Sequence, residues 1–160
     1  MKEKLIQLFE RLSVWWYGII AFVLYMGVQQ VILGYVNRFE ELTDGLPMIE
    51  LPILVNRSLY EIAVQYPQEA IRMYQTNLQP LDIFLPLTAG LWFAVALAFL
   101  TKSIFPSTSN WWLLPLLGVL ATFLDWAENI GVFFILRTLD APITGLDILT
   151  RVFILTKTAV

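Results

Sequence analysis

Two residue types are missing from this chain altogether, because it has no cysteine and no histidine. Without cysteine there can be no disulfide, no thiol catalysis, no iron–sulfur cluster and no thiolate-bound zinc. Without histidine the chain lacks the commonest haem and chlorophyll ligand and the usual general base near neutral pH. The sequence therefore excludes histidine-ligated haem or chlorophyll and cysteine-ligated metals, and it leaves any other cofactor unknown. Any chemistry must use carboxylates, amides, hydroxyls, lysine or arginine.

Charge is also scarce, since only 14% of the 160 residues are charged while 58% are hydrophobic. Ordinary soluble domains have about 25% charged residues, so this surplus of apolar surface needs lipid. The net charge of −3 gives no basic face of the kind that nucleic-acid binding requires. The lipid bilayer is thus the expected partner, and a nucleic acid is not.

Four apolar stretches predict membrane-spanning helices, at residues 13–36, 81–103, 111–136 and 143–160. The first has no charged residue and is long enough to cross a hydrocarbon core of roughly 30 Å. A cleaved signal peptide is the alternative there, but its apolar core would be only about 7 to 15 residues long. The last stretch carries three charges, so it is shielded inside the bundle, lies partly in the interface, or belongs to a chain that continues further.

The remaining segments suit positions outside the hydrocarbon core. In residues 1–12, basic and apolar side chains follow the pattern of an amphipathic helix that lies on the membrane surface. Residues 37–80 are acidic and contain prolines, up to Pro80, that should break any single long helix, with short helices at about 58–65 and 67–78. The predicted fold is an all-α integral membrane protein: a four-helix transmembrane bundle with an extramembrane cap between helices 1 and 2, in a single membrane domain over residues 1–160.

Basic residues usually favour the cytoplasmic side of a membrane. The N-terminal segment carries Lys2, Lys4 and Arg11, and Lys102 and Lys157 fall on the same side after two and four crossings. This pattern predicts a cytoplasmic N-terminus, with residues 37–80 outside, in what we expect to be a bacterial cell membrane.

Three polar residues, Asp125, Glu128 and Asn129, interrupt the third apolar stretch. Their spacings of three and four residues place them on one face of a helix, and a carboxylate facing lipid would cost roughly 2.5 to 3.5 kcal/mol. Counting depth from the predicted helix ends brings further polar residues to the same level. The sequence therefore predicts a shared buried site with four other members, namely Gln29, Gln30, Asp147 and Arg151.

This polar cluster has three interpretations. It is a structural network in which Arg151 neutralises one carboxylate and the amides satisfy the rest. Alternatively, it is a functional site whose desolvated carboxylate binds a proton, a cation or an amine-bearing ligand. The third interpretation is a catalytic carboxylate pair.

Outside the cluster, the sequence suggests only weaker sites. Arg72, Tyr74 and Asp82 lie near the predicted outer mouth and are candidates for lipid-headgroup contacts, although solvated surface residues are the simpler interpretation. Paired tryptophans such as Trp15 and Trp16 are most simply interfacial anchors. No catalytic residue and no metal site is predicted.

From about Tyr66 onward the chain resembles a family of small, uncharacterised multi-pass membrane proteins. The resemblance rests on a D-x-x-E-N motif in a transmembrane helix and on several single positions, namely Arg72, Tyr74, Asp82, Pro86, Asp125, Glu128, Asn129 and Lys157. It implies a shared fold and a shared site, and it implies no activity.

Three functions follow as hypotheses. The first is a non-enzymatic helix-bundle protein that serves as an accessory or assembly subunit of a larger membrane complex, with other membrane protein subunits as partners. The alternative is binding or transport of a proton, cation or small amphiphile through the buried carboxylates. The second alternative is a lipid-modifying enzyme, which the absence of histidine and of any nucleophile motif disfavours.

Overall fold

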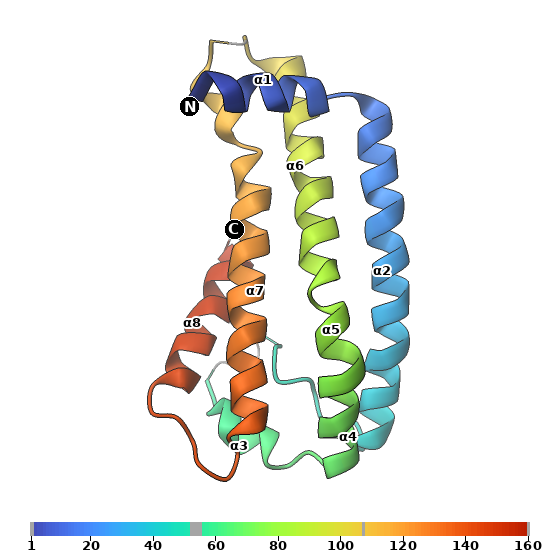
Figure 1. Cartoon of the computed structure of the whole chain (residues 1–160), viewed down its shortest axis with the longest axis vertical. Helices are drawn as coiled ribbons and strands as arrows, with labels where there is room; N and C mark the ends of the chain where they lie inside the picture. Colours follow the sequence, from blue (N-terminus) through green and yellow to red (C-terminus); the bar gives the residue numbers. More distant parts are fainter. Residues whose placement is uncertain (1, 52–55, 107, 160) are drawn as a thin grey trace.

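The computed structural model describes residues 2–51, 56–106 and 108–159, and within these ranges the chain is helical with no strand. The helix bounds are α1 Lys2–Leu12, α2 Trp15–Leu42, α3 Leu59–Ala63, α4 Gln68–Met73, the π-helical η2 Tyr74–Leu78, α5 Gln79–Leu81, α6 Phe84–Ile104, the 3-10 helix η3 Asn110–Leu113, α7 Leu116–Arg137 and α8 Leu146–Ala159. The helices α8, α7, α6 and α2 lie side by side from left to right (Figure 1). Residues 1, 52–55 and 160 of the predicted segments lie outside the described ranges.

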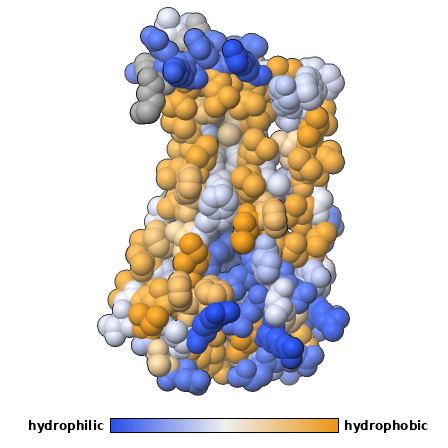
Figure 2. Space-filling model, viewed as in Figure 1, coloured by the Kyte–Doolittle hydropathy of each residue, from blue (hydrophilic) through white to orange (hydrophobic). Residues whose placement is uncertain are grey.

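Three helices are long and apolar enough to cross a membrane, which is consistent with an integral membrane protein. They cover Trp15–Leu42, Gln68–Ile104 and Asn110–Arg137, and only the described residues enter this comparison. Figure 2 shows a broad apolar band around their middle, with hydrophilic residues gathered beyond it and along the lower part of the face in view. Exposed apolar side chains on such helices are what a lipid environment requires.

The α1 helix lies across one end of the bundle, roughly perpendicular to the long helices (Figure 1). Its apolar face is anchored by Phe9, which packs with Ala98 of α6 and Trp112 of η3 in a small buried cluster. The helix predicted for residues 1–12 is therefore present, and it lies as an amphipathic surface helix would.

The α2 helix continues six residues past its predicted end at residue 36, because charge alone does not break a helix. Phe39 in this extension is almost fully buried and packs edge-to-face on Tyr66 and Tyr74. The helix ends where Asp44 and Gly45 adopt positive φ angles of 52° and 81°, which terminates the helical path.

Pro80 does not interrupt the second long helix, contrary to the sequence prediction. The helical path runs from Gln68 to Ile104, and the π-helical segment Tyr74–Leu78 directly precedes the proline. Proline lacks the N–H that would close an ordinary helical turn, and a wider turn before it relieves the clash with the preceding backbone. Pro80 stands in the first turn of α5, a position where its missing N–H costs little.

Neighbouring helices pack in the order α2, α6, α7, α8. The α6 and α7 helices approach so closely at Gly90 and Gly118 that a Cβ atom on Gly118 would lie 2.5 Å from the carbonyl oxygen of Gly90. Gly90 belongs to a run of small residues, with Ala94 and Ala98, that the sequence spaces four apart. Small residues at this spacing let helix backbones pack closely in lipid.

The α8 helix packs against α7 and runs from the α3 end of the bundle to about the middle of α7 (Figure 1). Its 14 residues rise about 21 Å, which is shorter than a hydrocarbon core of about 30 Å. It is therefore not among the helices long enough to span, and it begins three residues later than the predicted segment 143–160. A buried apolar core at this end joins α8, α3 and the lower parts of α2 and α7.

Candidate functional site

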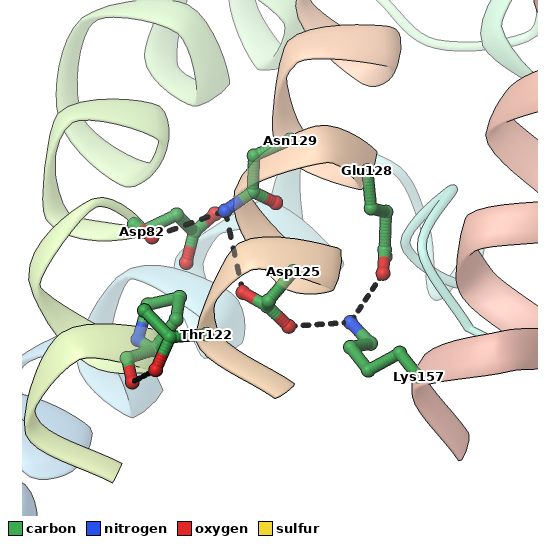
Figure 3. A network of polar contacts seen from close by, with 7 residues as sticks. Asp82, Thr122, Asp125, Glu128, Asn129 and Lys157 are labelled. Carbon is green, nitrogen blue, oxygen red and sulfur yellow. Dashed lines mark hydrogen bonds and ion pairs between the residues drawn. The ribbon is translucent and has the colours of Figure 1, made fainter. Parts of the chain in front are cut away.

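The predicted face of α7 carries Asp125, Glu128 and Asn129, and the structure adds Lys157 of α8 to them (Figure 3). The Lys157 ammonium nitrogen lies 2.8 Å from Asp125 Oδ1 and 2.5 Å from Glu128 Oε2. Glu128 has no exposed surface, while the side chains of Asp125 and Lys157 are 22% and 29% exposed. One lysine thus bridges two carboxylates at the contact between α7 and α8.

Asn129 connects α7 with the start of α6. Its Nδ2 donates to the carbonyl oxygen of Asp82 at 3.0 Å and lies 3.5 Å from Asp125 Oδ2. The Asp82 carbonyl would normally accept from the N–H four residues later, but that residue is Pro86, which has none. The Asn129 amide therefore supplies the donor that Pro86 removes, which explains why the two helices meet at this residue.

Thr122 makes the same kind of connection two turns earlier on α7. Its hydroxyl oxygen lies 3.0 Å from the carbonyl oxygens of Pro86 and of Gly118, so its single proton serves one of them at a time. Trp126 adds a third contact by donating from its indole to the Ile83 carbonyl at 3.0 Å. Together these bonds fix the carboxylate-bearing face of α7 against the start of α6.

A fourth element contributes Glu50, which the sequence analysis did not single out. Glu50 Oε1 is buried and has no hydrogen-bond partner among the described residues. Burial raises the pKa of Glu50 well above its usual range, the negative charges of Asp82 and Glu128 raise it further, and Lys157 lowers it. The segment is held inward by fully buried Ile49 and by the Tyr66 hydroxyl, which donates to the Pro47 carbonyl at 2.7 Å.

The Tyr66 hydroxyl lies close enough to Glu50 to be affected by its charge. Burial raises the pKa of the Tyr66 hydroxyl, and the nearby Glu50 raises it further. Nothing in the local sequence marks Glu50 as different from the surface acids around it, because its position depends on a loop that folds back into the bundle. Only the three-dimensional path of the chain could reveal it.

The charges of this cluster do not balance. Within the described ranges, four carboxyl groups, those of Glu50, Asp82, Asp125 and Glu128, interact with one ammonium group, that of Lys157. Uncompensated carboxylates buried together are unfavourable, so such a group takes up protons or binds a cation. Among the described residues, no set of three or more acidic side chains converges closely enough to hold a metal ion.

Two hollows reach this network from different sides. One, of about 240 Å³, is lined by Asp125 and Lys157 together with Tyr25, Pro86, Ala89, Gly90, Trp92, Phe93, Ala121 and Thr122. The other, of about 520 Å³, lies along Gln79, Trp126 and Asn129, and no described residue of its lining is ionisable. Only the first, which we call the aromatic cavity, gives access to the charged side chains.

Arg151, which the sequence predicts to neutralise one carboxylate of the cluster, has its ion pair outside the group of Asp125 and Glu128. It forms an ion pair of 3.0 Å with Asp147 on its own helix, and Asp147 Oδ1 also accepts from the backbone N–H of Leu59 at 2.7 Å. Because α8 begins at Leu146 rather than at residue 143, the position level with Glu128 moves toward Lys157. Lys157 had been indicated only by the family resemblance.

Gln29 and Gln30 do not join the cluster, contrary to the prediction. They lie on α2, which packs on α6, and neither side chain forms a hydrogen bond among the described residues. Gln30 is exposed and Gln29 is partly exposed. Depth along a helix does not determine which helices are neighbours.

The three candidate headgroup residues fall in different environments. Tyr74 is buried, with its ring 5.9 Å from that of Phe39, so it is a core residue. Asp82 belongs to the carboxylate cluster. Arg72 is exposed and lines a polar groove with Arg38, so a headgroup contact stays a prediction for Arg72 alone.

Comparison with known proteins finds no match, whether to protein-family models, to curated proteins or to solved structures. The site must therefore be interpreted from its own geometry.

Proposed function

We propose that the chain is a non-enzymatic integral membrane protein that binds a cationic species at its buried carboxylate–lysine cluster, the proton being the smallest such species. The observation that carries this proposal is the charge deficit around Glu128. In the part of the chain that the structure describes, the fully buried carboxylate of Glu128 shares the Lys157 ammonium with Asp125, and the carboxyls of Glu50 and Asp82 interact with the same charges. Intramembrane carboxylates in such surroundings typically mark ion and proton sites.

The family resemblance supports the same site. Its positions Asp82, Pro86, Asp125, Glu128, Asn129 and Lys157 lie far apart in the sequence, and these residues meet in one network. We propose that the resemblance reflects a shared cluster of this kind. Membership of that family remains part of the proposal.

The membrane arrangement belongs to the proposal as well. We propose that α8 completes a four-helix bundle as a half-span, shielded by α7, and that residues 37–80 form an extramembrane cap on the non-cytoplasmic side of a bacterial cell membrane. The ion pairs of Lys157 with Asp125 and Glu128 support the shielded position of α8. A charged side chain in the membrane is stabilised when it contacts opposite charges on a neighbouring helix instead of lipid.

Infrared spectroscopy of the purified protein tests the binding function, because protonated carboxyl groups absorb apart from carboxylates. We expect a protonated-carboxyl signal that persists above the pH range in which exposed carboxyls titrate. Glu128→Gln should weaken this signal, and Glu41→Gln, at an exposed position of α2, should leave it unchanged. Absence of the signal from the wild-type protein would refute the proposal, and thermal unfolding would show that the variants are folded.

A role as an accessory subunit is the second candidate, and the outward face of α2 favours it. Gly27, Gln30 and Gly34 are exposed on one face of this helix, and a Cβ atom on either glycine would meet no atom within 4 Å. A small-residue face with an unsatisfied amide suits contact with another transmembrane helix. Extraction in mild detergent tests it: recovery of only a monomer with no co-purifying protein would remove this candidate.

A further inference from the structure

The aromatic cavity combines features that the cluster alone does not have. Its volume is about 240 Å³, and it lies where α2, α6 and α7 face one another beside the end of α8. Of the described residues that line it, Asp125 and Lys157 are the charged ones. A molecule that enters this space therefore meets the exposed edge of the charge-deficient cluster.

Three aromatic side chains line the same space. Tyr25 of α2 and Trp92 of α6 have nearly parallel rings with centroids 5.9 Å apart, and Phe93 is the third. The faces of aromatic rings carry partial negative charge and attract cations within about 6 Å. The rings and the excess of carboxylate charge thus favour the same kind of ligand.

The polar groups of these rings are also available. Among the described residues, neither the Tyr25 hydroxyl nor the Trp92 indole N–H has a hydrogen-bond partner. Thr122, in contrast, is already engaged with backbone carbonyls. Both side chains are partly exposed, so a ligand with an acceptor group can receive hydrogen bonds from them.

We propose that the aromatic cavity binds a small organic ammonium ion, with the charged nitrogen between Asp125 and the aromatic rings and an apolar body against Pro86, Ala89 and Ala121. This inference rests on the proposed function, because it names the class of cation that the cluster receives. An anion would approach Lys157, but that ammonium is already paired with two carboxylates. A neutral molecule would leave the charge deficit unchanged.

Binding of the ammonium should displace a proton from the cluster. The incoming cation supplies positive charge beside Asp125, so a neighbouring protonated carboxyl loses its proton to the surrounding buffer and no covalent bond to the ligand forms. The heat of binding should then depend on the ionisation enthalpy of the buffer. This proton release links the cavity with the acidic residues behind it.

Three probes that share one skeleton test the charge selectivity: phenethylammonium, 2-phenylethanol and phenylacetate. Titration calorimetry of the full chain in detergent micelles, with empty micelles as reference, should give affinities that fall in that order. We expect Asp125→Asn and Trp92→Leu each to weaken phenethylammonium binding at least 10-fold, about 1.4 kcal/mol. Trp111→Leu, at an exposed tryptophan outside the cavity, should have no effect.

The calorimetric and infrared results together separate the ammonium site from the proposed function. Equal binding of the ammonium and the alcohol, or tighter binding of phenylacetate, would overturn the inference. If the infrared signal of the protonated carboxyl is present but phenethylammonium does not bind, only the ammonium site fails. If that signal is absent as well, the proposed function fails with it. Should Asp125→Asn not fold, Trp92→Leu and Tyr25→Phe on the partly exposed wall carry the test.

Discussion

The α8 helix contains two ion-pair sites that use the same residue types in different ways. Arg151 and Asp147 are one turn apart on the same helix, 3.0 Å from each other, and Asp147 also accepts a backbone N–H from α3. Lys157, farther along α8, contacts two carboxylates of α7, one of them fully buried. The first site pairs one cation with one carboxylate on the same helix, whereas the second shares one cation between two carboxylates of a neighbouring helix.

This difference explains why one site is a candidate for function and the other is not. A balanced pair within one helix contributes little and needs no ligand. A buried group of carboxyls with one ammonium must acquire charge from a proton or a ligand. The four predictions that follow alter these two sites or the helix packing that supports them, beginning with the largest expected effect.

Replacing Lys157 with methionine should have the largest effect, because it leaves the buried Glu128 without its counter-ion. Loss of one partner of a buried ion pair costs about 3 to 5 kcal/mol of the free energy of unfolding. The loss should shrink at acidic pH, where the carboxyls are protonated. Thermal unfolding in micelles measures it, and an equal loss in Arg151→Met would contradict the comparison.

Replacing Gly131 with alanine should separate α8 from α7. A Cβ atom at this position would lie 2.9 Å from Cγ2 and 3.0 Å from Cβ of Thr150, so α8 must shift. Such overpacking costs about 1 to 3 kcal/mol. Gly34→Ala is the matched control, since its Cβ would meet nothing within 4 Å, and an equal destabilisation of both variants would argue against close α7–α8 packing.

Replacing Glu50 with glutamine should stabilise the protein at neutral pH. The raised pKa of Glu50 means that the unfolded chain releases this proton at lower pH than the folded chain does, so wild-type stability falls as pH rises above about 4.5. Glutamine removes this dependence, and the difference between variant and wild type should vanish near that lower limit. Unfolding measured across pH tests it; a destabilised variant at neutral pH would be inconsistent with a surplus of negative charge.

Replacing Arg151 with glutamine should have the smallest effect, because the Arg151–Asp147 pair lies within one helix and is partly exposed. Pairs of this type contribute about 0.2 to 1 kcal/mol. Asp147→Asn should cost somewhat more, since it also weakens the hydrogen bond that the Leu59 N–H donates. Added salt should reduce the loss of unfolding free energy in Arg151→Gln. A loss of several kcal/mol that does not depend on salt would show that this pair behaves as a buried ion pair.

Much of the fold follows from the sequence because hydrophobic runs determine which segments enter lipid. The three spanning helices, the amphipathic N-terminal helix and the face shared by Asp125, Glu128 and Asn129 were all predictable. The continuation of the helix through Pro80 was not, because a π-helical turn upstream accommodates the proline. Helix ends at charged residues were also placed too early, as α2 illustrates.

The site was predicted less completely than the fold. Counting depth identified the level of the cluster but not which helices are neighbours, so Gln29 and Gln30 were wrongly included. The same count chose Arg151 over Lys157 because it began α8 three residues too early. Glu50 could not be found at all, because a loop rather than a helix periodicity brings it to the carboxylates.

A pair of double-mutant cycles tests the central claim most directly, namely that Lys157 rather than Arg151 compensates the buried carboxylate. The cycles combine Glu128→Gln with Lys157→Met and, separately, with Arg151→Met, and they compare free energies of unfolding at neutral pH. We predict a coupling energy of about 1 to 3 kcal/mol for Glu128 with Lys157, several-fold larger than that for Glu128 with Arg151. Equal couplings, or a larger coupling with Arg151, would contradict the account.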